Sequence, residues 1–91
     1  MILGKVVGSL VSTRKHDKLV GAKFLIVRPL YTDEDGVVVA VDAIGAGIGD
    51  KVIISTGSSA RIAAGNPESV ADAIIVGIVD QIRLDEANDR S

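Results

Sequence analysis

The sequence contains no cysteine and no tryptophan, and His16 is its single histidine. Disulfide bonds and thiolate metal sites are therefore excluded, and so is a metal site built from several histidines of one chain. A serine nucleophile would have only His16 available as a histidine base. Aromatic residues make up 2% of the chain, so side chains that stack on nucleotide bases are scarce.

An excess of positive charge is also missing. Ten basic and twelve acidic residues give a formal net charge of -2, which does not favour binding to nucleic acid or to an anionic membrane. No segment approaches the ~20 consecutive apolar residues of a membrane span. The opening MILGKVVGSLVS has a lysine inside its apolar stretch and no cleavage motif after it, so we expect no secretory signal and a cytoplasmic location.

Aliphatic residues dominate what is present, since 47% of the 91 residues are hydrophobic and almost none are aromatic. Valine and isoleucine favour strands, and short strands separated by polar turns predict a small barrel. We therefore expect a mainly β protein, a five-stranded OB-like barrel with one short helix between the last two strands. The expected strands are 2–12, 23–30, 37–44, 51–56 and 73–84, the helix is 58–65, and one domain, 1–84, precedes a polar tail, 85–91.

Two of these strands are apolar on both faces. AIIVGIV (73–79) and VVVAV (37–41) do not alternate between apolar and polar residues, whereas a barrel strand needs only its inner face to be apolar. The outer face must be covered, either by a partner subunit or by the short helix. The patch is large for one short helix to cover, so the sequence favours an oligomer.

The glycine-rich stretch AIGAGIGDKVIIST (43–56) does not fit a nucleotide loop. Its third glycine comes one residue too early for G-x-G-x-x-G, and a strand rather than a helix follows it. Turn glycines are the simpler interpretation. Likewise, GSSA (57–60) is not G-x-S-x-G, so capping of the short helix explains Ser58 and Ser59. No catalytic group is therefore expected.

Asp42 and Asp80 lie in or beside apolar strands, where a carboxylate needs a partner. Arg61 is a candidate partner for one of them. The run Asp33-Glu34-Asp35 has a simpler interpretation as a solvated turn.

Five motifs occur in order along the chain: KVVGSLVST (5–13), LVGAKFL (19–25), AVDAIGAGIGDKV (40–52), GSSAR (57–61) and AIIVGIVD (73–80). Together they resemble the EutN/CcmL family of pentameric vertex proteins of bacterial microcompartments. The resemblance runs from about Ile2 to Asp80. It implies a homopentamer at the vertices of a polyhedral shell, among hexameric shell proteins, where pentamers introduce curvature. Such shells include carboxysomes and catabolic metabolosomes.

If the resemblance holds, the protein is structural, is not an enzyme and needs no cofactor or metal. Small residues suit the crowded five-fold axis, and the candidates for this axis or its pore are Gly45, Ala46, Gly47, Gly57, Ser58 and Ser59. The candidates for the subunit interface are Ile75, Val79, Asp42 and Arg61, while Ile74, Val76 and Ile78 are assigned to the barrel core. A shift of strand register would exchange the two faces.

A free-standing OB-like oligomeric module that binds a small molecule or an oligonucleotide is the alternative. It would share the fold, but Phe24 and Tyr31 are its only aromatic residues, and such modules use stacking aromatics in basic grooves.

Overall fold

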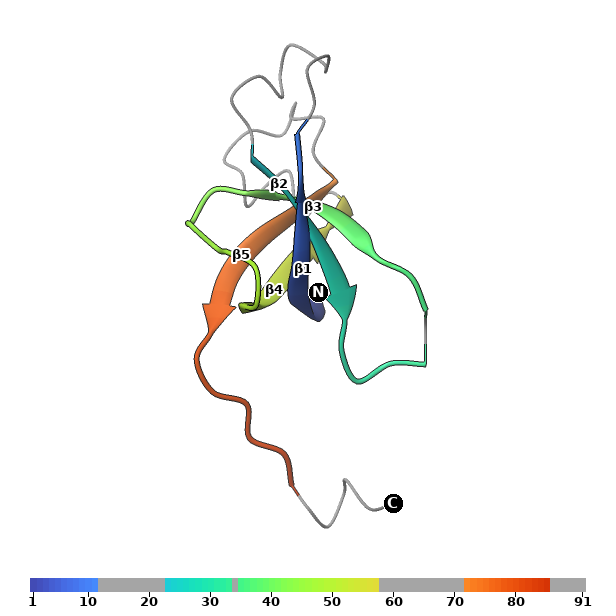
Figure 1. The fold of residues 1–91 in the computed structure, drawn as a ribbon. Helices are drawn as coiled ribbons and strands as arrows, with labels where there is room; N and C mark the ends of the chain where they lie inside the picture. The colour runs from blue at the N-terminus through green and yellow to red at the C-terminus, as the bar shows by residue number, and fades with distance from the viewer. Residues whose placement is uncertain (12–22, 34, 58–71, 86–91) are drawn as a thin grey trace.

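Five strands close into a β-barrel (Figure 1). The computed structural model describes residues 1–11, 23–33, 35–57 and 72–85. The strands are β1 (Ile2–Leu10), β2 (Lys23–Pro29), β3 (Val38–Asp42), β4 (Lys51–Thr56) and β5 (Ala73–Val79), in the closed order β1-β2-β3-β5-β4. The expected five-stranded barrel is thus confirmed. The expected helix 58–65, with Ser58, Ser59 and Arg61, lies outside the described residues.

All neighbouring strands are antiparallel except β3 and β5, which run parallel. The last strand is shorter than the sequence predicted, because it ends at Val79 rather than at residue 84. Val79 lies opposite Lys51, the first residue of β4. β4 pairs with β5 no further than that point, and Gln81–Asp85 leave the barrel without strand structure (Figure 1).

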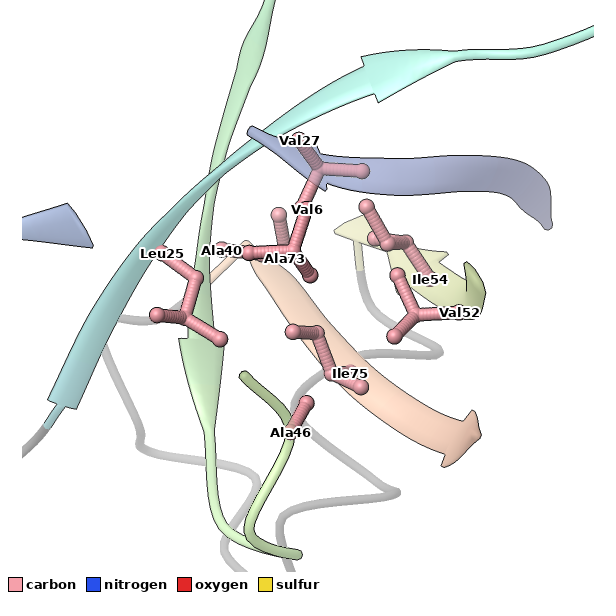
Figure 2. Packing of buried hydrophobic residues seen from close by; sticks show 9 residues of the cluster. All are labelled: Val6, Leu25, Val27, Ala40, Ala46, Val52, Ile54, Ala73 and Ile75. Carbon is pink, nitrogen blue, oxygen red and sulfur yellow. The ribbon is translucent and has the colours of Figure 1, made fainter. Parts of the chain in front are cut away.

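The barrel interior is filled by aliphatic side chains (Figure 2). Every strand contributes, and the segment between β3 and β4 adds one alanine. The buried cluster consists of Val6, Leu25, Val27, Ala40, Ala46, Val52, Ile54, Ala73 and Ile75. Residues directly opposite one another in a ladder share a face, so this cluster also fixes which neighbouring residues face outward.

A β-bulge interrupts β5. Ile53 lies opposite Gly77 and Ile54 lies opposite Ile75, which leaves Val76 without a partner on β4. An extra residue of this kind bends the strand and shifts the alternation of its side chains by one position. The two halves of β5 therefore do not follow one common alternation.

This shift corrects the core assignment made from the sequence. The sequence predicts Ile75 outside the barrel, but it is 1% exposed and belongs to the core cluster. It predicts Val76 inside, but Val76 is the extra residue and is 37% exposed. Ile78 lies opposite the core residue Val52 and so shares the inner face, as predicted, although it is 40% exposed. Ile74 is buried, as expected, although it is not part of that cluster. Strict alternation failed because nothing in AIIVGIV marks the position of the extra residue.

Gly4 marks a close approach between β1 and β2. A Cβ atom added at Gly4 would collide with Cγ1 of Val27 and would lie 3.0 Å from the backbone oxygen of Arg28. The side chain of Val27 is fully buried in the core and the backbone of β2 is held in two ladders, so neither can move aside easily. Only glycine fits at this position.

We expect Gly4→Ala to lower the free energy of unfolding by ~1–3 kcal/mol, the usual cost of overpacking. Gly8→Ala on the same strand is the matched control. Its added Cβ would lie 3.3 Å from Cδ1 of Ile26, the far end of a side chain that can rotate away. Urea unfolding followed by circular dichroism measures both variants, and equal losses would contradict the close-approach argument.

Candidate assembly surfaces

The outer faces of β1, β2, β4 and β5 carry one continuous surface. Leu3 lies opposite Ile53, and Lys5 lies opposite both Lys51 and Arg28. Lys51 in turn lies opposite Val79. Because their neighbours along β1, β2 and β4 point into the core, these side chains point outward. We call this set the wall patch: Leu3, Lys5, Arg28, Lys51, Ile53 and Val79.

Three cations form a row across the wall patch. Lys51, Lys5 and Arg28 are direct cross-strand neighbours and all are exposed. In the part of the chain that the structure describes, none of them forms an ion pair. Like charges directly opposite one another destabilise a sheet by roughly 0.2–1 kcal/mol per pair. In a single chain this row therefore costs stability, which an acidic partner would recover.

The apolar half of the wall patch lies beside this row. Leu3, Ile53 and Val79 are half-buried. Gly77, also half-buried, lies opposite Ile53. Because glycine has no side chain, the outer surface is lower there than at Ile53. An apolar strip flanked by charged residues is the usual composition of a protein interface.

The glycine-rich segment between β3 and β4 is a turn fastened to β1. The amide of Asp50 donates to the carbonyl of Gly47 at 3.0 Å, and the amide of Gly47 donates to Oδ2 of Asp50 at 2.9 Å. The amide of Gly49 donates to the carbonyl of Val6, and that of Val6 donates to the carbonyl of Asp50, both at 2.9 Å. These glycine amides are used within the chain, as a turn requires, rather than directed at a phosphate.

Asp42 holds the start of the same segment. Its side chain is 2% exposed; Oδ1 accepts the amide of Ile44 at 3.1 Å and Oδ2 lies 3.6 Å from Nζ of Lys23. The same Nζ donates to the carbonyl of Ala46 at 2.8 Å. Lys23 thus ties β2, β3 and the glycine turn together. The sequence indicated that Asp42 needs a partner, but it did not single out Lys23, which faces Asp42 only through the β2–β3 register.

The candidate axis residues do not form one group. Gly45 and Gly57 are exposed, with φ angles of 87° and 63° that favour glycine. Ala46 instead packs in the core. The glycine turn precedes β4 and Gly57 follows it, so six residues at ~3.3 Å each separate the two. Any opening lined by both would have to extend along β4.

Two further properties concern only residues 1–11, 23–33, 35–57 and 72–85. Their acidic side chains form no group of three that could hold a metal ion. Within these residues, no helix has the length and the hydropathy that crossing a bilayer requires.

The closed barrel thus carries on its wall an apolar strip and a basic row that has no ion pair among the described residues, a surface typical of proteins that associate with others. Residues 1–80 match the family model described as "Ethanolamine utilisation protein EutN/carboxysome". The chain belongs to this EutN/CcmL family. It is a shell vertex protein of bacterial microcompartments, and it is not an enzyme.

Individual relatives agree with this assignment. The chain is 48% identical to the bacterial microcompartment shell vertex protein GrpN of Rhodospirillum rubrum over 90% of this chain and 96% of that protein. It is 43% identical to the shell vertex protein PduN of Salmonella typhimurium over 90% and 98% of the two chains.

Solved structures of relatives share the fold. The structure of GrpN, a pentameric microcompartment shell protein, matches with a TM-score of 0.83 at 45% identity, over 93% of this chain and all of that chain. The structure of CcmL from a Nostoc species matches with a TM-score of 0.83 at 38% identity, over 91% and 93% of the two chains. The vertex function that the resemblance implies is therefore confirmed, and the matches cover nearly the whole chain.

We expect Lys23→Met to lower the free energy of unfolding by ~1–3 kcal/mol, because it leaves the buried carboxylate of Asp42 with fewer partners. The amides of Gly47 and Gly49 should also exchange faster with deuterium, since the turn loses its tie to β2. Arg83→Met is the control, because Arg83 is exposed beyond β5 and its described hydrogen bond, to Gln81, is long at 3.4 Å. Unchanged exchange at Gly47 and Gly49 would contradict the role given to Lys23.

Proposed function

We propose that five copies of this chain close into a head-to-tail ring through the outer wall of the barrel, and that this ring sits among hexameric shell tiles. The wall patch carries the proposal, because its half-buried apolar strip and its cations, which have no ion pair within the described chain, are costly in a lone barrel. The relative GrpN, described as pentameric, supports five copies. A pentamer that replaces a hexamer in a flat sheet of tiles forces the sheet to curve.

The four predicted interface residues have different roles in this proposal. Val79 lies on the outer face beside Lys51 and is half-buried, so it contacts the neighbouring subunit. Ile75 fills the core and supports that face from within. Asp42 acts within its own chain by holding the glycine turn. Arg61 stays a predicted interface residue, outside the described part of the chain.

Small residues line the five-fold axis in the same proposal. Gly45, Gly47 and Gly57, together with Ser58 and Ser59, are compact enough for five copies to converge. The exposed, left-handed backbone at Gly45 and Gly57 supports this placement, because no bulky side chain competes for the space around them.

We expect Val79→Asp to abolish the ring while the chain stays folded. The new carboxylate would enter an apolar contact between subunits, yet within its own barrel it would lie opposite Lys51, a favourable pair. Native mass spectrometry should give a five-fold multiple of the chain mass for the unchanged protein and a single chain for the variant. Leu84→Asp is the control, because Leu84 is exposed beyond β5. A monomeric unchanged protein would contradict the ring.

A further inference from the structure

A second surface with exposed apolar side chains lies around the connection between β2 and β3. Three large apolar side chains are exposed there, Tyr31, Val37 and Val39. Asp33 and Asp35 are exposed between them in the chain. We call these five residues the turn patch. It combines apolar area with negative charge, whereas the wall patch combines apolar area with positive charge.

Tyr31 stands out within the turn patch. Its φ angle is +57°, and it is the one non-glycine residue among those described with a left-handed backbone. Such a conformation is strained for a residue other than glycine and is often found where function requires it. The residue is 66% exposed, so packing within the described chain does little to offset the strain. Tyrosine is also among the residues that contribute most to protein interfaces.

We propose that the turn patch of one subunit docks on the wall patch of the next, and that this contact closes the ring. The proposal rests on the proposed pentamer and names its two complementary surfaces. Asp33 and Asp35 would face the row of Lys51, Lys5 and Arg28, while Tyr31, Val37 and Val39 would cover Leu3, Ile53 and Val79. Opposite charges thereby relieve the repulsion within the row, and apolar area meets apolar area.

The occupant of the wall patch is a second copy rather than the chain's own turn. Arg28 and Asp35 line the same groove, yet they form no ion pair among the described residues. The two surfaces are different patches, so contact between them is heterologous, and a heterologous contact closes into a ring when the rotation allows it. A two-fold dimer would use both contacts between the same two chains, whereas the ring uses each patch on a different neighbour.

Reversing one charge on each patch tests the contact. Lys5→Glu places a carboxylate in the wall patch, and Asp35→Lys places an ammonium in the turn patch. We expect each single variant to shift the protein concentration at half-assembly at least tenfold upward at low salt. The double variant should recover most of that loss, because the two charges are exchanged across the contact. Sedimentation velocity over a concentration series measures all four proteins.

The same set of variants also includes controls for folding and for net charge. In a lone barrel the Lys5→Glu carboxylate would lie opposite Lys51 and Arg28, so the melting temperature of the monomer should not fall. Arg83→Glu makes the same change of net charge outside both patches and should leave the ring unchanged. Raising the salt concentration should weaken the unchanged ring, because the contact is charged at its rim.

Each outcome decides between the claims. If the unchanged protein does not form a five-fold species, the proposed function fails. If it does, but Lys5→Glu and Asp35→Lys assemble normally, the pentamer stands and this contact is wrong. Loss in both single variants without recovery in the double variant also overturns the pairing. Normal rings of Lys5→Glu that no longer join hexameric shell proteins would reassign the wall patch to the tiles.

Discussion

Closure of five short strands around a narrow core is the constraint on which the other features depend. Nine aliphatic residues form the core cluster, and Ile2 and Val38 pack against it. The apolar residues on the outer wall cannot enter this core, so they meet water, which penalises them. The same closure sets the registers that align Lys51, Lys5 and Arg28 across the wall. Both the apolar strip and the basic row are thus consequences of how this barrel closes.

The connection between β3 and β4 also depends on the closed barrel, because it packs against the core and bonds to β1. It extends past the end of β3, places Ala46 in the core and returns to β1 through hydrogen bonds between Gly49, Asp50 and Val6. Glycine is needed at Gly45 and Gly49 because the backbone there is left-handed. The segment that first suggests a phosphate loop is therefore a structural turn, held to β1 by these hydrogen bonds.

The sequence predicted the fold class and the positions of all five strands, because β-branched runs and polar turns are local signals. It also predicted that Asp42 needs a partner. It did not predict Lys23 as that partner or the alignment of the three cations, since both depend on register between strands far apart in the chain. The error at Ile75 has the same origin, because one unpaired residue at Val76 changes the side on which its neighbours lie.

Covalent capture of the contact between subunits tests the head-to-tail ring most directly. The chain has no cysteine, so a variant with Lys5→Cys and Asp35→Cys contains only the two introduced thiols. A disulfide forms only when the Cα atoms come within ~7 Å, so mild oxidation reports true proximity between wall and turn. The account predicts a ladder of cross-linked chains on a denaturing gel that ends at five. A ladder that stops at two, or no cross-linking at all, would contradict it.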